Sequence, residues 1–357
     1  MPTGGGKSLL YMLHSLERNM CVILFCPFVL LCSQVCSTQL CENLCVVNWK
    51  DINRSNMDVH ASTAHIVVCP YEAASMNSTL VGFAQRLHDI YRLGNIVVDE
   101  AHVLVHDQNY RKFAGFWTFL PHLKRVLNGK VCVVAMTATL RPKHEAFLAK
   151  QLGFTSPQPE QVTWTVFRKP CFRQLSVRLQ KLRTKEDAVQ ELVIVLNACL
   201  AQSTTSCAIV FCMTIEEVEE LGSDLAEMVP ECVINHSKLD QLLNFKVFQQ
   251  TRIMISTSSA GAGLDIADLD HVIIWRSTWT VEHFVQMGGR TGRHRPGSLT
   301  VLQFNHYSCS VSTDREIATL IECVFAERPW FSCCFDLNCA TSYNHTHRIF
   351  QNKQDWR

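Results

Sequence analysis

Short runs of apolar, mostly β-branched residues recur along most of the chain, separated by longer stretches with helical spacing. Hydrophobicity within each run is continuous, which is typical of strands covered on both faces. The predicted strands are CVILFC (21–26), HIVVC (65–69), NIVVD (95–99), VCVVAM (131–136), AIVFC (208–212), RIMIST (252–257), HVIIW (271–275) and LTVLQF (299–304). Helical patterns such as Asp187–Leu200 and Thr214–Met228 lie between them, so the sequence predicts parallel sheets built from βαβ units.

Composition extends this prediction to domain organisation. A chain of 357 residues with 47% hydrophobic residues is too long for one ordinary domain and too apolar for a disordered protein. Two α/β domains followed by a short tail are expected. The 33 basic and 32 acidic residues nearly cancel, so a nucleic-acid partner would have to be held by a local patch of charge.

The cysteines and the apolar runs indicate in which cellular compartment the protein resides. Eighteen cysteines are scattered through apolar runs, which favours buried thiols in a reducing compartment over a disulfide scaffold. No secretory leader pattern opens the chain. The longest apolar run, Cys21–Cys32, is shorter than the roughly 20 residues of a membrane span and contains Pro27. We therefore expect an intracellular protein without a membrane partner.

A basic segment separates the two halves. SPQPEQ (156–161) is typical of a loop, and no acidic residue occurs from Gln161 to Lys185, where seven basic side chains follow. The segment is expected to be a linker, and its charge has two interpretations. It is either a solvated face or a strip that contacts phosphates.

The first motif with chemical content is PTGGGKS, which precedes a helical pattern. Its glycines allow consecutive backbone N–H groups to point at phosphate oxygens, Lys7 can reach the β- and γ-phosphates, and the Ser8 hydroxyl can bind Mg²⁺. The predicted nucleotide-binding residues here are Thr3, Gly4, Gly5, Gly6, Lys7 and Ser8. A full phosphate-loop pattern would have glycine at Met1.

Two motifs follow the next strands of the first half. Asp99-Glu100-Ala101-His102 closes the strand NIVVD, at the edge where doubly wound sheets place ligand chemistry. Asp99 would hold Mg²⁺, and Glu100 would polarise the attacking water for phosphoryl transfer. Thr137-Ala138-Thr139 follows the strand VCVVAM, where small hydroxyl residues either couple the nucleotide site to a second surface or serve as turn residues.

The second half supplies the complementary groups. ISTSSAGAGLDIADLD combines a strand, a turn of small residues and an acidic residue, Asp265. QMGGRTGR (286–293) places Arg290 and Arg293 three residues apart, on one face of a helix or turn. An arginine offered from a second domain can stabilise charge on a γ-phosphate in the transition state.

The order PTGGGKS, CPFVLL, DEAH, TAT, STSSAGAGLD and QxxGRxGR resembles the two-domain motor of superfamily-two helicases. Within it, the chain is most similar to the RecQ family of ATP-driven 3′-to-5′ DNA helicases. The features that distinguish this family from other superfamily-two helicases are the DEAH and TAT motifs, the FRKP segment with Arg168 and Pro170, and the last motif, which begins with Gln286. The resemblance covers residues 1 to about 308. It implies two tandem RecA-like α/β domains with parallel sheets, at 1–164 and 165–308, and a tail at 309–357.

The resemblance also implies roles for single residues. Lys7, Ser8 and Asp99 would bind ATP and Mg²⁺, Glu100 would carry hydrolysis, and Asp265 would approach the nucleotide from the second domain. Gln286, Arg290 and Arg293 would complete the site. Coupling of ATP state to DNA contact is assigned to His102, Thr137 and Thr139, and contact with single-stranded or partly duplex DNA to Ser75 and Thr257.

Three features depart from the family pattern. A strand and an adenine-reading glutamine motif precede the phosphate loop in the family, whereas this chain begins inside the loop. We therefore expect a fragment, a mis-started gene product or a decayed paralogue, with an unfilled slot in the first sheet beside the strands ending at Asp99 and Met136. The aromatic-rich loop after DEAH is replaced by VLVHDQNYRKF, where Tyr110 and Arg111 stand for its Phe-Arg end. Met287 and His294 replace a glutamate and an aspartate of the last motif.

The tail leaves two alternatives open. RecQ proteins carry a helical hairpin with four zinc-binding cysteines after the motor, and the tail has four cysteines and two histidines without the paired C-x₂-C spacing. These residues, Cys323, Cys333, Cys334, Cys339, His345 and His347, are either remnant zinc ligands or ordinary side chains.

For function, the leading prediction is a nuclear ATP-dependent DNA helicase of the kind used in DNA repair and recombination. An inactive nucleic-acid-binding remnant and an RNA helicase are the alternatives.

Overall fold

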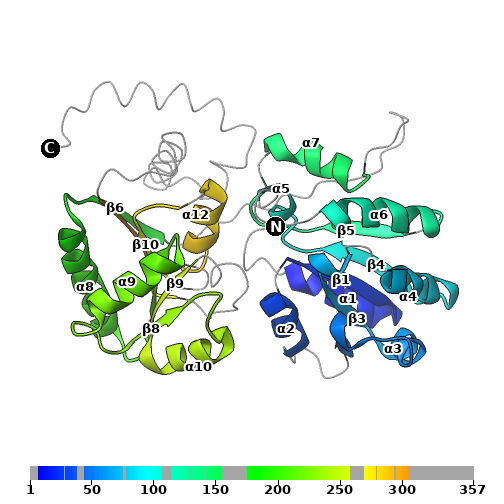
Figure 1. Cartoon of the computed structure of the whole chain (residues 1–357), viewed down its shortest axis with the longest axis horizontal. Coiled ribbons are helices and arrows are strands. Elements are labelled where there is room, and N and C mark those ends of the chain that lie inside the picture. The colour runs from blue at the N-terminus through cyan, green and yellow to red at the C-terminus, as the bar shows by residue number, and fades with distance from the viewer. Residues whose placement is uncertain are drawn as a thin grey trace. The chain divides into compact units, whose positions relative to one another are not determined.

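The structure is a computed structural model that describes residues 7–27, 29–37, 44–74, 78–106, 114–129, 131–140, 142–154, 175–257, 269–278, 280–292 and 295–304. The chain forms two compact units, Met1–Lys169 and Pro170–Arg357, each containing one parallel sheet (Figure 1). They are called unit 1 and unit 2 below. The fold is α/β in both units, as the sequence predicts.

Unit 1 contains a five-stranded sheet in the order β2-β3-β1-β4-β5. Its strands are β1 (Cys21–Cys26), β2 (Val46–Asn48), β3 (Ile66–Pro70), β4 (Leu93–Val98) and β5 (Cys132–Ala135). Its α-helices are α1 (Lys7–Arg18), α2 (Val29–Ser37), α3 (Met57–Thr63), α4 (Ser78–Asp89), α5 (Val103–His106), α6 (Ala114–Val126) and α7 (Pro142–Gln151), with short 3₁₀ helices η1 (Trp49–Asp51) and η2 (Tyr71–Ala74).

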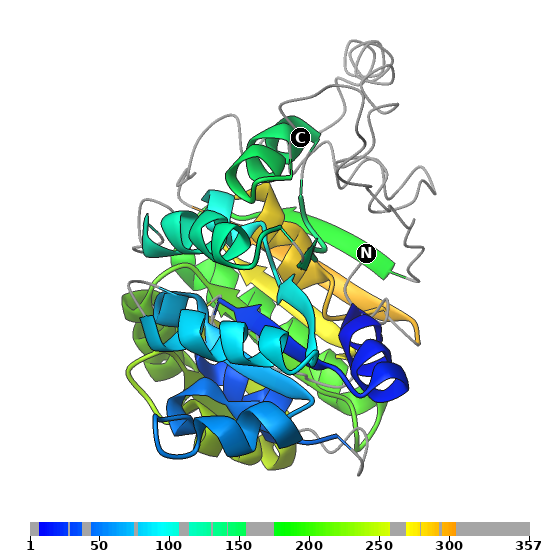
Figure 2. The ribbon, with the colours of Figure 1, turned by 90° about the vertical axis from the view of Figure 1, so that its right-hand side faces the viewer.

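Side chains of β1 alternate between the two faces of this sheet, and both faces are covered by helices. Ile23 and Phe25 belong to the core that contains Leu80 of α4 and Phe116 of α6, whereas Leu24 packs in a second cluster with α1 and α2. Figure 2, in which unit 1 faces the viewer, shows helices on both sides of its strands. Burial of both faces explains why these strands have continuous apolar sequences.

Strand β5 differs from the central strands. It pairs with β4 in parallel, with Asn95 opposite Cys132. Among the described residues β5 is the outermost strand on this side of the sheet. Cys132 is exposed and the rest of β5 is only partly buried, although its sequence is as apolar as that of a central strand.

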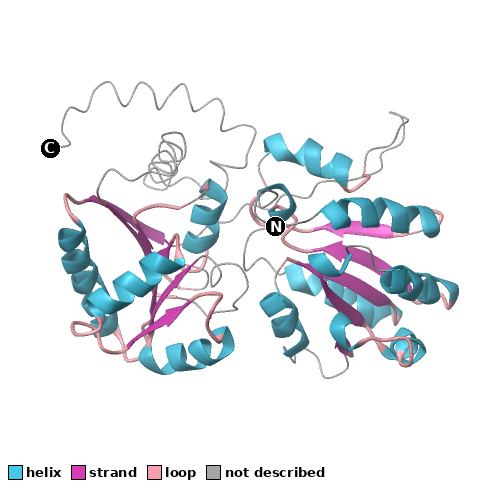
Figure 3. Ribbon diagram, viewed as in Figure 1, coloured by secondary structure: helices cyan, strands magenta, loops and turns pink. Residues whose placement is uncertain are grey.

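Unit 2 contains a six-stranded parallel sheet in the order β6-β11-β10-β7-β9-β8. Its strands are β6 (Leu175–Lys181), β7 (Ala208–Cys212), β8 (Cys232–Asn235), β9 (Ile253–Thr257), β10 (His271–Trp275) and β11 (Gly297–Gln303), and its helices are α8 (Lys185–Gln202), α9 (Ile215–Leu225), α10 (Gln241–Thr251) and α12 (Val281–Gly288). Apolar residues of α8 and α9 form one core with β7, β9 and β10. Helix α12 contacts β10 and lies across the sheet from α8 (Figure 3).

The elements match the predicted ones with three additions and one correction. Strands β2, β6 and β8 were not predicted. Strand β6 lies inside the segment that the sequence analysis assigned to a linker, and it pairs with β11 along its whole length. The predicted strand and helix ends shift by a few residues; for example, α8 begins earlier because Thr184 and Asp187 form a reciprocal capping box.

The described cysteines are free thiols, as expected for a reducing compartment, and several, such as Cys26, Cys69 and Cys212, are buried. Burial raises the pKa of Cys69 and Cys212, and a hydrogen bond with Cys32 together with burial raises the pKa of Cys26, which keeps these thiols protonated. Among the helices that the structure describes, none has the length and apolar composition needed to cross a membrane.

Candidate active site

The candidate site lies in unit 1, where α1 begins and where β4 and β5 end. Lys7 is the first residue of α1, and Asp99 and Thr137 follow the carboxyl ends of β4 and β5. The partial positive charge of a helix N-terminus and the carboxyl edge of a parallel sheet both favour the binding of phosphate groups. The fold therefore gathers three predicted motifs that are up to 130 residues apart in the sequence.

An ion pair joins the phosphate-loop motif to DEAH. The Lys7 Nζ lies 3.2 Å from Glu100 Oε1, and the two side chains are only 12% and 17% exposed. Partial burial strengthens such a pair relative to one in water. The same lysine can turn to a phosphate group when one is present, which would release Glu100 toward a water molecule.

A second contact joins DEAH to the TAT motif. His102 is buried, and its Nδ1 lies 2.9 Å from Thr137 Oγ1 and 3.3 Å from Glu100 Oε2. The Thr137 hydroxyl also accepts a hydrogen bond of 3.2 Å from the backbone N–H of Thr139. The Thr137 side chain therefore joins the backbone of its own motif to the His102 ring. The contacts thus run from Lys7 through Glu100 and His102 to Thr137.

The backbone holds the DEAH carboxylates in place. Asp99 N–H donates to the Phe25 carbonyl at 2.9 Å, and Ala101 N–H donates to the Met136 carbonyl at 2.9 Å. Glu100 adopts a left-handed conformation with φ of 48°, which costs a non-glycine residue free energy. These bonds on both sides compensate for that strain, so the backbone of the motif is held in place at the end of β4.

Asp99 is partly buried, and this changes its ionisation. Burial, together with the neighbouring Glu100 carboxylate, raises the pKa of Asp99 to about 7, while Lys7 and the Glu100 N–H oppose the rise. A divalent cation at this carboxylate would favour its ionised form. The Asp99 carboxylate and the Ser8 hydroxyl offer the hard oxygen ligands that Mg²⁺ prefers, so the residues fit this ion.

Tyr71 belongs to this site although the sequence analysis did not single it out. Its hydroxyl donates a hydrogen bond to the backbone carbonyl of Asp99, and its ring packs against Phe116 with 5.0 Å between centroids. Tyr71 starts η2, directly after β3, four residues before the predicted DNA contact Ser75. An aromatic residue at the end of a buried strand was the only signal available in the sequence.

The predicted residues of unit 2 lie on its own elements. Thr257 ends β9, Gln286 lies near the end of α12, and Arg290 follows that helix; Gln286 and Arg290 are 8% and 9% exposed. Several predicted residues lie outside the described part of the chain, namely Thr3, Gly4, Gly5, Gly6, Ser75, Tyr110, Arg111, Asp265 and Arg293. The same holds for the tail with its candidate zinc ligands. Among the described residues, no group of three or more histidine, cysteine or acidic side chains is arranged to hold a metal ion.

Comparison with known proteins agrees with this geometry. The family model described as DEAD/DEAH box helicase matches residues 1–147, and the helicase conserved C-terminal domain matches residues 184–295. The chain is 27% identical to "ATP-dependent DNA helicase Q5" of Mus musculus over 316 residues, which are 82% of this chain and 31% of that protein. It is 24% identical to "ATP-dependent DNA helicase RecQ" of Bacillus subtilis over 320 residues, 85% of this chain and 50% of that protein.

The chain carries the two domains of a DEAD/DEAH box helicase, and its sequence is similar to those of RecQ helicases. It spans between about a third and a half of the length of these two relatives. Among solved structures, the helicase MrfA bound to DNA matches with a TM-score of 0.66 and 18% identity over 92% of this chain and 46% of that one. The Mycobacterium smegmatis helicase Lhr bound to single-stranded DNA and AMP-PNP matches with a TM-score of 0.65 and 17% identity, over 90% and 45% of the two chains. These matches confirm the tandem RecA-like fold.

Proposed function

We propose that this RecQ-like chain is an ATP-driven motor that moves 3′-to-5′ along single-stranded DNA. The observation that carries the proposal is the line of contacts from Lys7 through Glu100 and His102 to Thr137. It joins a phosphate-binding group, a candidate general base and a coupling residue, which are the parts that phosphoryl transfer linked to movement requires.

In this proposal Lys7 binds the β- and γ-phosphates of ATP, and Ser8 and Asp99 hold Mg²⁺. When bound, Mg²⁺ neutralises charge that develops on the phosphates. Once a phosphate replaces the carboxylate as the partner of Lys7, Glu100 orients and deprotonates the attacking water. His102 senses the position of Glu100 and transmits it to Thr137 at the end of β5.

The second unit contributes arginines in this proposal. Arg290 and Arg293 stabilise charge on the γ-phosphate, Gln286 and Asp265 approach the nucleotide, and Thr257 contacts the DNA backbone together with Ser75, Tyr110 and Arg111. We place the boundary between the two motor domains at residues 164 and 165, and the working protein in the nucleus. The motif order supports the roles of these residues, and the eukaryotic DNA helicase relatives support the location.

A second candidate function is an RNA helicase. The chain is 27% identical over 248 residues to "Putative DEAD-box ATP-dependent RNA helicase 43" of Arabidopsis thaliana, which covers 67% of this chain. The last motif argues against it, since Gln286 stands where DEAD-box RNA helicases have His-Arg.

The test is ATP hydrolysis by the purified chain with no nucleic acid, with single-stranded DNA and with single-stranded RNA. Lys7→Ala is compared with Lys150→Ala, which removes an exposed lysine at the end of α7. We expect hydrolysis that DNA stimulates more than RNA, that Lys7→Ala abolishes and that Lys150→Ala retains. Stronger stimulation by RNA would establish the second candidate. Folded protein without Lys7-dependent hydrolysis would refute both and indicate a binding remnant.

A further inference from the structure

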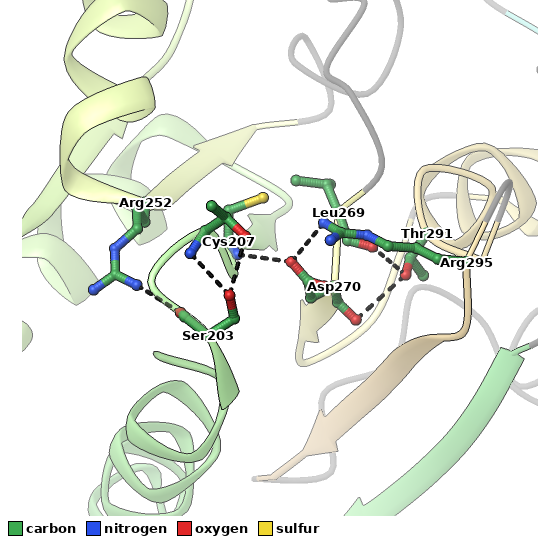
Figure 4. A network of polar contacts seen from close by, with 8 residues as sticks. Ser203, Cys207, Arg252, Leu269, Asp270, Thr291 and Arg295 are labelled. Atoms are coloured by element: carbon green, nitrogen blue, oxygen red, sulfur yellow. Dashed lines mark hydrogen bonds and ion pairs between the residues drawn. The ribbon is translucent and has the colours of Figure 1, made fainter. Parts of the chain in front are cut away.

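The segment that follows α12 is attached to the start of β10 by a network of polar contacts that no motif predicts (Figure 4). The network lies where β7, β10 and β11 begin, at the amino edge of the unit 2 sheet. It contains the turn with Arg290, and its members come from four separate stretches of the chain.

The first attachment is a buried hydroxyl. Thr291 Oγ1 donates a hydrogen bond of 2.6 Å to the carbonyl of Leu269, and both residues are fully buried. The carbonyl of Arg290 accepts a longer contact of 3.4 Å from the Leu269 N–H. Arg290 and Thr291 are therefore joined to Leu269 through both of its backbone polar groups.

The second attachment is the carboxylate of Asp270, the next residue. Asp270 Oδ2 accepts from the guanidinium of Arg295 at 2.9 Å and from the backbone N–H of Cys207 at 2.9 Å. Figure 4 shows Asp270 between Cys207 and Arg295. Because Cys207 directly precedes β7 in the core of the sheet, the carboxylate anchors Arg295 to a rigid element.

Close packing leaves this segment little freedom. A Cβ atom placed on Gly297 would lie 1.9 Å from Thr291 Oγ1 and 2.7 Å from the backbone nitrogen of Gly292. The turn is thus pressed against the first residue of β11. A shift of Arg290 along its backbone would require this packing and the Thr291 bond to break together.

We propose that Thr291 and Asp270 are positioning residues for ATP hydrolysis, which hold the backbone of Arg290 so that its guanidinium can act on the γ-phosphate. The inference rests on the proposed function. Arg290 directly precedes Thr291, so the first attachment acts on its backbone directly. Misplacement of a charge that acts in the transition state lowers kcat with little effect on substrate binding.

The test uses Thr291→Val, which keeps the shape of the side chain and removes the hydroxyl, and Thr291→Ser, which keeps the hydroxyl. Thr300→Val is the matched control, since Thr300 is an equally buried threonine of the same sheet whose hydroxyl bonds to His271 instead. Arg295→Met breaks the second attachment at a side chain that is 44% exposed, so folding should survive. Thermal unfolding of each variant establishes that the assayed protein is folded.

For DNA-stimulated ATP hydrolysis we expect Thr291→Val to lower kcat about tenfold with KM for ATP within about twofold, and Arg295→Met to lower it about threefold. Thr291→Ser and Thr300→Val should stay within about twofold of the wild type. If Thr291→Val fails to fold, the test rests on Arg295→Met, whose kcat should be lower than that of Thr291→Ser. The inference alone would be overturned if Thr291→Val and Arg295→Met hydrolysed ATP at the wild-type rate. It would also be overturned if Thr291→Ser and Thr300→Val lost as much activity as Thr291→Val. A wild-type chain without Lys7-dependent hydrolysis would overturn the proposed function as well.

Discussion

Lys7 and Glu100 lie 93 positions apart in the chain, yet Lys7 Nζ and Glu100 Oε1 are 3.2 Å apart at the start of α1 and the end of β4. The lysine thereby occupies the carboxylate that would serve as the general base. Binding of a phosphate group by Lys7 would exchange one anionic partner for another. In the proposed mechanism this exchange would make the activity of Glu100 depend on the presence of nucleotide.

Glu100→Gln should therefore abolish turnover and leave nucleotide binding largely intact. The amide can still accept a hydrogen bond from Lys7, but it cannot take a proton from water, so hydrolysis should fall about 100-fold or more. Single-turnover hydrolysis and binding of a fluorescent ATP analogue separate the two effects. Asp58→Asn, which changes an exposed carboxylate of α3, is the control. Turnover by Glu100→Gln at the wild-type rate would remove Glu100 from the mechanism.

The contact between His102 and Thr137 predicts a different phenotype. Thr137→Val removes the hydroxyl that lies 2.9 Å from His102 Nδ1 and that accepts from the Thr139 N–H. If this contact transmits the state of Glu100, the DNA-stimulated rate should fall about tenfold and the basal rate by less. Steady-state rates with and without single-stranded DNA measure the ratio. Thr63→Val, which removes an exposed hydroxyl of α3, controls for loss of a hydroxyl. Equal loss of both rates would assign Thr137 a structural role.

Strands in the middle of each sheet were predictable, and most of those at the edges were not. The three unpredicted strands, β2, β6 and β8, are all outermost strands of their sheets. An edge strand is buried less completely, so it lacks the continuous apolar run that marks a central one. In β6 only Val177 is buried, and Arg178 points to an exposed ion pair with Glu191. Two of the basic residues that suggested a linker, Arg178 and Lys181, therefore belong to a partly solvated edge strand.

The site was predictable where chemistry requires a local motif. Lys7, Glu100 and Thr137 each lie in a short pattern whose function depends on neighbouring residues. The contributions of Tyr71 and Thr291 depend on hydrogen bonds to backbone carbonyls 28 and 22 positions away. A backbone carbonyl is the same at every position, so such a partner leaves no trace in the sequence.

Two helical glycines should respond oppositely to replacement by alanine. A Cβ atom on Gly222 of α9 would lie 2.6 Å from Ile234 Cγ2 in β8, whereas one on Gly82 of α4 meets nothing within 4 Å. Gly222→Ala should destabilise the protein by about 1–3 kcal/mol, because helix and strand must separate. Gly82→Ala should stabilise it by about 0.5–1 kcal/mol through higher helix propensity. Urea unfolding measures both, and destabilisation by Gly82→Ala would contradict the packing described here.

His271 should make stability depend on pH. It begins β10, and burial, with a smaller effect of Arg178, lowers its pKa from 6.5 to about 4, while Asp270 opposes the shift. Between these two values the unfolded chain binds a proton that the folded protein does not, so stability is full above pH 6.5 and falls as the pH falls toward 4. The slope contributed by this group is at most about 1.4 kcal/mol per pH unit.

His271→Gln removes the titrating group and keeps a side chain able to hydrogen-bond Thr300. The free energy of unfolding should therefore depend less on pH between about 4.5 and 6.5, which is roughly the interval between the two pKa values. Urea unfolding at several pH values in this range gives the slope for the wild type and the variant. His122→Gln, at an exposed position of α6, serves as the matched control, and we expect its slope to equal that of the wild type. Identical slopes in the wild type and His271→Gln would mean that His271 is protonated in the folded protein over this pH range. The attraction of the Asp270 carboxylate would then have to offset the cost of burying the charged ring.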